Sequence, residues 1–182
     1  MSIEIEKKYR IEAANRESLV AMLNEANAKF LGREFEENTI YSNHRLRESG
    51  SIVRIRKTET RSILTFKRRI DNQFDVKQQI EHETEISDAA AAEAIIGELG
   101  LKPILVYEKY RDTWKFRSVE LVIDELPFGN FMEIEGSITA IKEAEILLGI
   151  EDLETEHETY PRLTTLLGVR SGDLVEARFE RG

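Results

Sequence analysis

The sequence predicts an α+β protein in which an eight-stranded antiparallel β-barrel forms a tunnel with a charged interior and helices packed outside. Segments that alternate apolar and charged residues recur along the chain, beginning with residues 2–11. Strand side chains alternate between two faces, so each such segment has one apolar and one charged face. Eight such segments are enough to close a barrel. Three or four amphipathic helices can cover its apolar exterior.

The composition fits one domain over residues 1–182, with a core at 2–150 and a C-terminal helical tail at 151–182. Hydrophobic residues make up 41% and charged residues 34% of the 182 positions, which suits a globular protein. A net charge of -9 argues against nucleic acid or anionic membranes as partners. The absence of cysteine excludes thiolate chemistry. We expect no signal peptide and a cytoplasmic location, because charge begins at Glu4 and no apolar run has membrane-spanning length.

The first half of the chain alternates strands with one helix and two turns. After residues 2–11, Asn15 is a plausible N-cap, and apolar residues recur at helical spacing as far as Phe30, before Gly32. Strands are predicted at 37–44, 51–58 and 62–69, with a loop at 45–50. Asp71-Asn72 predicts a hairpin turn into a strand that ends at residue 86.

The second half repeats this pattern with more apolar strands. Ser87 begins a helix that Gly100 ends. Strands are predicted at 104–116, 119–124 and 131–136, and Ser137 begins a third helix that runs to Gly149. A final helix is expected around 163–167, and the polar residues from about Ser171 are expected to be loose.

The predicted tunnel face contains both signs of charge. Its acids are Glu4, Glu6, Glu81, Glu83, Glu85, Glu120, Asp124, Glu133 and Glu135. Its bases are Lys8, Arg10, Arg54, Arg56, Lys67, Arg69, Lys109 and Arg111. An enclosed ion costs several kcal/mol unless it is paired. The groups either pair with one another or receive a charged ligand, and a metal-bound polyphosphate suits both signs because Arg and Lys bind phosphate and carboxylates bind Mg²⁺ or Mn²⁺.

An ordered series of motifs on these strands resembles the CYTH, or triphosphate tunnel metalloenzyme, superfamily. The motifs are Glu4-Ile5-Glu6-Lys7-Lys8, Arg54-Ile55-Arg56, Lys67, Glu83-Thr84-Glu85, Lys109-Tyr110-Arg111, Asp124 and Glu133-Ile134-Glu135. The resemblance covers residues 2 to 150. It implies a tunnel that binds triphosphates with a divalent metal, as in thiamine triphosphatases, inorganic triphosphatases and class IV adenylyl cyclases.

The resemblance also assigns roles by position. The residues implied to bind phosphate are Lys8, Arg54, Arg56, Lys67, Lys109 and Arg111. The residues implied to bind metal are Glu4, Glu6, Asp124, Glu133 and Glu135. Glu81, Glu83 and Glu85 fall at acidic positions to which no single role is assigned. We expect Glu4 and Glu6 to activate water through a metal, and Lys8 to stabilise charge.

Tyr41 marks a departure from the family pattern. Many members have two adjacent aromatic residues followed by aspartate in the second strand, whereas this chain has Ile40-Tyr41-Ser42. Some triphosphatases are thought to activate water with a lysine–tyrosine pair. Tyr41 is therefore either a catalytic residue of this kind or a packing residue.

Metal-dependent hydrolysis of a triphosphate is the function we favour from the sequence. The substrate would be inorganic triphosphate, thiamine triphosphate or a nucleoside triphosphate. The alternative is a class IV-type adenylyl cyclase that makes cyclic AMP and pyrophosphate from ATP. A third possibility is a non-catalytic polyphosphate-binding module. The sequence leaves the oligomeric state open, a homodimer included.

Overall fold

The computed structural model describes residues 2–70 and 77–181. The strands in these residues are β1 (Ser2–Ile11), β2 (Lys29–Ser42), β3 (Ser51–Lys57), β4 (Ser62–Ile70), β5 (Lys77–Ile86), β6 (Lys102–Phe116), β7 (Val119–Leu126), β8 (Gly129–Glu135), β9 (Val169–Ser171) and β10 (Leu174–Ala177). The helices are α1 (Arg16–Glu25), α2 (His44–Glu48), α3 (Ala89–Glu98), α4 (Ile138–Leu148) and α5 (Tyr160–Leu167), with a 3-10 turn at Ala13–Asn15. None of the helices described is both long enough and apolar enough to cross a membrane.

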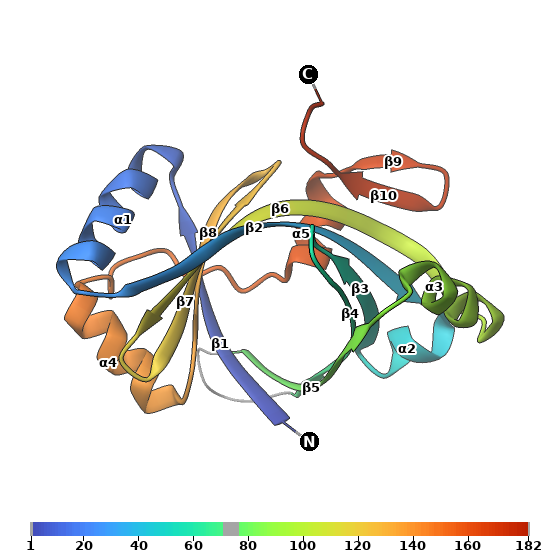
Figure 1. The fold of residues 1–182 in the computed structure, drawn as a ribbon, viewed down its shortest axis with the longest axis horizontal. Helices are drawn as coiled ribbons and strands as arrows, with labels where there is room; N and C mark the ends of the chain where they lie inside the picture. Colours follow the sequence, from blue (N-terminus) through green and yellow to red (C-terminus); the bar gives the residue numbers. More distant parts are fainter. Residues whose placement is uncertain (1, 71–76, 182) are drawn as a thin grey trace.

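The first eight strands form a ring, which confirms the predicted fold class. The order is β2-β3-β4-β5-β1-β8-β7-β6, and pairing of β2 with β6 closes it. Every pairing around the ring is antiparallel. Figure 1 shows the long β2 and β6 strands crossing the molecule together along one side of the ring.

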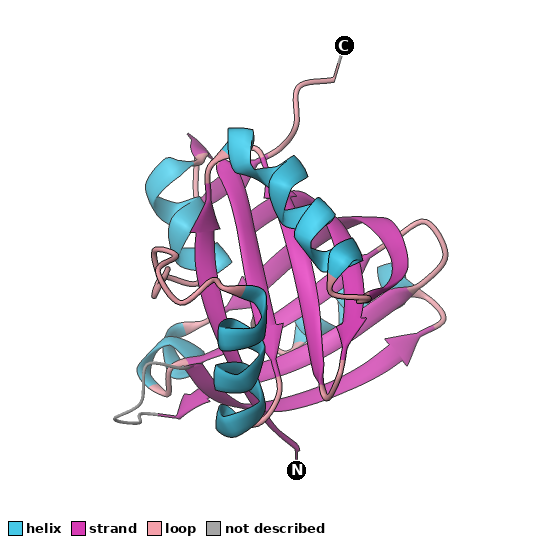
Figure 2. Ribbon diagram, turned by 90° about the vertical axis from the view of Figure 1, so that its left-hand side faces the viewer, coloured by secondary structure: helices cyan, strands magenta, loops and turns pink. Residues whose placement is uncertain are grey.

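Helices cover the apolar outer faces of the strands, as their alternation predicts. α1 contributes Leu23 and α4 contributes Ile141 to a core with Tyr9, Leu121 and Ile134, which point outward from β1, β7 and β8. Figure 2 views this side, where helices lie across the strands. Because each strand sends its alternate residues to the helices, the charged residues between them face the interior of the ring.

Residues 169–177 form β9, a turn and β10, so the prediction of a loose segment from Ser171 is wrong for this part of the chain. β10 pairs in parallel with β6, through Val175 and Leu105 among others. On that side of β6, β7 pairs only from Tyr110 onward, which leaves the edge at residues 105–107 for β10. Edge strands have unpaired backbone groups, and β10 satisfies them here.

The structure also corrects several predicted boundaries. α1 ends at Glu25, and the backbone turns through Asn27, whose φ is 57°. Phe30 therefore belongs to β2, where its ring packs against Trp114 at 4.7 Å between centroids. The predicted loop at 45–50 contains α2, which Asn43 caps by accepting a hydrogen bond from the Leu46 amide at 3.0 Å. The Asp71-Asn72 turn lies outside the described residues.

Candidate active site

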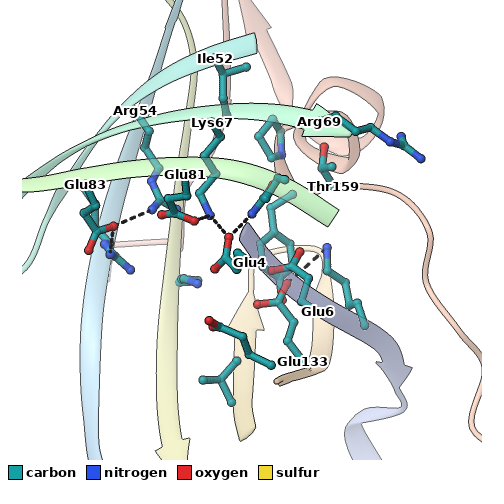
Figure 3. Close-up of a pocket in the computed structure, with 18 of the residues that line it drawn as sticks. Glu4, Glu6, Ile52, Arg54, Lys67, Arg69, Glu81, Glu83, Glu133 and Thr159 are labelled. Atoms are coloured by element: carbon teal, nitrogen blue, oxygen red, sulfur yellow. Dashed lines mark hydrogen bonds and ion pairs between the residues drawn. The ribbon is translucent and has the colours of Figure 1, made fainter. Parts of the chain in front are cut away.

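A cavity of about 650 Å³ lies inside the ring, and charged side chains form most of its wall. Seven basic residues line it: Lys8, Arg54, Arg56, Lys67, Arg69, Lys109 and Arg111. Seven glutamates line it: Glu4, Glu6, Glu81, Glu83, Glu120, Glu133 and Glu135. The other groups include Tyr107 on β6 and Thr159, Tyr160 and Pro161 at the start of α5. Figure 3 shows Glu4, Lys67 and Glu81 directed toward one another, and Arg69 directed away from them.

Lys67 joins two glutamates on the β1, β4 and β5 side of the cavity. Its Nζ lies 3.0 Å from Glu4 Oε2 and 2.7 Å from Glu81 Oε2. Burial and a hydrogen bond with Glu4 raise the pKa of Glu81 to about 7. Burial alone would raise the pKa of Glu4, but the hydrogen bond with Glu81 and the charge of Lys67 hold it below its usual value. Glu4 is therefore the carboxylate of this pair that stays ionised.

The two arginines of β3 share one carboxylate. Arg56 Nη2 lies 3.0 Å and Arg54 Nη2 lies 3.7 Å from Glu83 Oε2. Arg54 also donates to Thr65 Oγ1 at 3.2 Å. Glu83 is an exposed residue, whereas Arg54 is buried. A phosphate group could therefore replace Glu83 while both guanidinium groups keep their positions.

The bases of β6 are held by carboxylates behind the cavity wall. Asp124 is fully buried and accepts hydrogen bonds from Arg111 Nε at 2.7 Å, Arg111 Nη2 at 2.6 Å and Lys109 Nζ at 3.2 Å. Glu36, which is 1% exposed, lies 3.4 Å from Lys109 Nζ and 3.4 Å from Arg56 Nη1. Burial would raise the pKa of Glu36, but the charges of Lys109, Arg111, Arg56 and Arg54 hold it well below its usual value. Two fixed negative charges thus stabilise the buried cations.

A carboxylate-rich patch occupies the adjoining strands β1, β8 and β7. Glu6 lies opposite Glu135, and Glu135 lies opposite Glu120, in cross-strand register. Burial and the charges of Glu4, Glu120 and Glu6 raise the pKa of Glu135 to about 7. Within residues 2–70 and 77–181, Glu120 and Glu135 have no ion pair with a base. Directly opposed like charges are destabilising, and a cation would relieve them.

The carboxylate-rich patch suits a hard divalent cation, since its donors are carboxylate oxygens. Glu6, Glu120 and Glu135 are the residues that would hold it, with Glu4 and Glu133 next to them on the same faces. As the side chains lie, no three His, Asp or Glu residues of the described ranges are close enough to form a metal site. Binding therefore requires rotation of these side chains within the cavity.

Comparison with known proteins gives the family. Residues 2–161 match the CYTH domain. The chain belongs to the CYTH domain family. A Methanocaldococcus jannaschii protein named "Putative adenylate cyclase MJ0240" is 29% identical over 150 residues, covering 80% of this chain and 83% of that protein.

Two solved structures illustrate the likeness of this CYTH domain to others. The PH1012 protein of Pyrococcus horikoshii is 26% identical, with a TM-score of 0.75 over 86% of this chain and 96% of that one. The Hippeastrum protein named "Putative adenylyl cyclase HpAC1", which is described as having a dominant triphosphatase activity, has a TM-score of 0.65 at 18% identity. That match covers 86% of this chain and 92% of the Hippeastrum protein, and it shows the fold alone.

Most of the motif residues of the CYTH domain line the cavity, but Tyr41 does not. It packs on the outer face with Ile55 and Ile96, under α3. Burial and the neighbouring Glu93 raise its pKa to about 12. The tunnel-facing position beside it in β2 is Ile40, because adjacent strand residues face opposite sides. Tyr41 therefore lies outside the cavity wall, a position that fits the packing alternative and not the catalytic one.

Two predicted acids and one base also differ from expectation. Asp124 lies behind Lys109 and Arg111 and is absent from the cavity wall, so its expected place as a metal ligand is not seen. Glu85 is exposed near the end of β5 and does not line the cavity. Arg10 is predicted on the tunnel face but does not line the cavity. It pairs with Glu156, and its guanidinium carbon lies 5.2 Å from the centroid of the Phe131 ring.

The residues of the site that the sequence does not predict include Glu36, Tyr107 and Tyr160. Glu36 is missed because the second strand is predicted from residue 37, eight positions after its true start at Lys29. The pattern Glu34-Phe35-Glu36 is the available signal. Tyr107 shares a strand face with the β6 bases but carries no charge that would mark it. Tyr160 lies just before the helix expected around 163–167, which the sequence does not connect with the tunnel. Nothing in the sequence places the start of α5 against the ring interior, since that depends on the path of residues 150–159.

Proposed function

We propose that this CYTH domain hydrolyses a metal-bound triphosphate in the ring cavity. The observation that carries the proposal is one cavity with two chemically different walls. One wall holds Arg54, Arg56, Lys67, Lys109 and Arg111, and the other holds the opposed carboxylates Glu6, Glu120 and Glu135. The negative charge of a triphosphate complements the basic wall, and the positive charge of its divalent cation complements the carboxylates.

The bases have distinct tasks in this proposal. Arg54 and Arg56 present guanidinium groups beside the exposed Glu83, which phosphate oxygens can replace. Lys109 and Arg111 stay fixed on Asp124 and neutralise charge that develops on the phosphate in the transition state. Fixed groups of this kind need no rearrangement during the reaction, which is where their catalytic advantage lies.

Water attacks the terminal phosphorus in line with the bridging oxygen that leaves. The new bond joins the water oxygen to phosphorus, the bond to the bridging oxygen breaks, and the water proton passes to a carboxylate of the patch. Glu6 is the proposed acceptor, because it lines the cavity opposite Glu135 in the carboxylate-rich patch. The divalent cation, when bound, neutralises phosphate charge and favours ionisation of water. No tyrosine of β2 takes part.

An adenylyl cyclase is the second candidate, since the Methanocaldococcus jannaschii relative carries that name. The same bases would hold ATP, the ribose 3′-hydroxyl would attack the α-phosphorus, and pyrophosphate would leave. A cyclase name does not by itself decide the reaction, because the Hippeastrum protein carries such a name and is described as mainly a triphosphatase.

A product analysis tests the proposal. Purified protein is incubated with tripolyphosphate, thiamine triphosphate or ATP, with Mg²⁺, Mn²⁺ or EDTA, and orthophosphate, pyrophosphate and cyclic AMP are measured. Metal-dependent orthophosphate supports the hydrolase, whereas cyclic AMP with pyrophosphate supports the cyclase. Tight binding of tripolyphosphate without any product would instead support a non-catalytic binding module.

A further inference from the structure

Tyr160 lies where the C-terminal segment meets the cavity. It is the first residue of α5, which Thr159 caps by accepting a hydrogen bond from the Arg162 amide at 3.2 Å. Thr159, Tyr160 and Pro161 all line the cavity. Figure 1 shows α5 within the outline of the ring. A segment outside the eight ring strands therefore supplies part of the wall.

The segment that leads to Tyr160 is attached to β1. The Arg10 amide donates to Glu154 O at 2.9 Å, and the Glu156 amide donates to Lys8 O at 2.8 Å. Lys8 Nζ in turn donates to Glu158 O at 2.9 Å. Backbone bonds on both sides of Tyr9 thus fix this segment beside the strand that carries Lys8. Tyr160 is held in a defined position relative to that lysine.

The side chain of Tyr160 touches three charged groups of the site. Its hydroxyl donates to Asp124 Oδ2 at 2.8 Å. Lys8 Nζ lies 3.9 Å and Lys109 Nζ lies 5.2 Å from the centroid of its ring. The Phe131 ring meets it edge-on at 5.4 Å, and Tyr160 is 6% exposed. A cation near a desolvated aromatic face is attracted by the ring without losing its hydrogen-bond donors.

We propose that Tyr160 is a positioning residue that holds the Lys8 and Lys109 ammonium groups for the phosphate chain. The ring attracts both ammonium groups without neutralising them, as a further carboxylate there would. Its hydroxyl gives Asp124 a neutral donor, so this carboxylate remains fixed behind Lys109 and Arg111 without another cation. The inference rests on the proposed triphosphate site.

Tyr9 offers a matched control on the opposite face of β1. It is fully buried, its hydroxyl donates to Glu145 Oε1 at 2.6 Å, and Lys7 Nζ lies 5.4 Å from its ring centroid. The chemistry repeats that of Tyr160, but Tyr9 belongs to the outer core with α4. A general effect of removing a buried tyrosine would appear in both positions, whereas an effect on the phosphate site would appear only at Tyr160.

The test compares Tyr160→Leu, Tyr160→Met and Tyr160→Phe with Tyr9→Leu and Tyr9→Phe. Tripolyphosphate binding is measured by calorimetry in EDTA, KM and kcat are measured with metal, and thermal unfolding checks the fold. We expect Leu and Met at position 160 to weaken binding and raise KM about tenfold or more, the factor that follows from losing a desolvated cation–π contact. Phe keeps the ring and should change KM less than the other two.

The outcomes separate this inference from the proposed function. Equal binding by wild type and folded Tyr160→Leu or Tyr160→Met protein would overturn the inference, as would equal losses in the Tyr9 variants. Unfolding of both non-aromatic variants at position 160 would assign the ring to the fold and also overturn it. If wild type binds tripolyphosphate without hydrolysing it, the proposed function fails, and the binding comparison still decides the role of Tyr160.

Discussion

Arg111 and Asp124 form a two-point contact across β6 and β7. Arg111 Nε lies 2.7 Å from Asp124 Oδ1 and Nη2 lies 2.6 Å from Oδ2, and the two residues are direct cross-strand partners. Asp124 is fully buried and also accepts hydrogen bonds from Lys109 Nζ and the Tyr160 hydroxyl. Replacement of this one carboxylate would leave the buried Lys109 and the half-buried Arg111 without their main partner.

Asp124→Asn should therefore lower both stability and activity. The carboxylate of Asp124 accepts four hydrogen bonds, and an amide has one oxygen acceptor and no negative charge. Loss of one partner of a buried ion pair costs about 3–5 kcal/mol. Urea unfolding measures the loss of stability, and kcat/KM is measured on the folded fraction. Arg111→Lys keeps the charge but removes the two-point contact, and it should give a smaller loss of stability. An Asp124→Asn protein as stable as wild type would contradict the proposed role of Asp124 as the fixed partner of these bases.

Glu6→Gln should abolish turnover and leave the fold intact. It replaces one of the opposed carboxylates of β1 and β8 by an amide of the same size, so a cooperative unfolding transition should remain in EDTA. Orthophosphate release at saturating Mg²⁺ or Mn²⁺ measures the loss. Glu12→Gln, at an exposed position just after β1, is the control and should behave as wild type. Full activity of Glu6→Gln would remove Glu6 from the mechanism.

Glu135 should make the metal-free protein less stable as pH rises. Its pKa is raised from 4.5 to about 7, so between these values the folded protein binds more protons than the unfolded chain. The free energy of unfolding therefore falls through this window as pH increases. Unfolding in EDTA across this range should show the slope, and Glu135→Gln should reduce it. The exposed Glu85→Gln provides the control, and an unchanged slope in Glu135→Gln would disprove the assignment.

Tyr41→Phe should leave kcat and KM unchanged. Tyr41 faces α3, outside the cavity, and its pKa is raised by burial and by the neighbouring Glu93. Loss of the hydroxyl should change stability by no more than about 1 kcal/mol. Steady-state kinetics beside thermal unfolding distinguish the two effects. A large fall in kcat would show that Tyr41 reaches the substrate after all.

Arg178→Ala should loosen the closure of the ring. Glu37 and Glu108 are cross-strand partners of β2 and β6, and Arg178 Nη1 lies 2.6 Å from the first and 2.8 Å from the second. Its removal leaves the nearly buried Glu108 with weaker partners, a loss of about 1–3 kcal/mol. Arg117→Ala breaks an exposed pair with Glu143 and should have little effect. Equal unfolding midpoints for the two variants would refute this role of Arg178.

Much of the ring was predictable because strand alternation is a local property. Glu4, Arg56, Lys67 and Glu133 lie on the charged faces of their strands, and each is two positions from another charged residue that lines the cavity. Local patterns do not reveal the turn at Asn27, where φ is positive, just before β2 begins at Lys29. The sequence therefore predicts Phe30 in a helix and leaves Glu36 outside the second strand. Alternation shows which face of a strand a side chain lies on, but it does not show whether other side chains cover it. The sequence therefore predicts Asp124 on the cavity wall, whereas Lys109 and Arg111 lie between it and the cavity.

The position of Tyr160 could not be read from the sequence for a different reason. Its contacts with Asp124 and Lys8 join residues 36 and 152 positions apart. No periodicity connects such residues, and only the backbone bonds of residues 154 and 156 with β1 determine where α5 begins. The C-terminal hairpin was missed likewise, because β10 depends on an edge of β6 that the shorter β7 leaves uncovered.

The seam between β2 and β6 has a consequence for biosynthesis. Its thirteen residue pairs join positions from Ser42 with Lys102 to Lys29 with Lys115, which are 60 and 86 residues apart in the chain. As the nascent chain leaves the ribosome, one hydrogen-bonding edge of β2 stays unpaired until β6 has emerged. Closing a loop of this length is slow. During that interval the open edge can pair with another chain, so assistance from chaperones should matter most before residue 116 is synthesised.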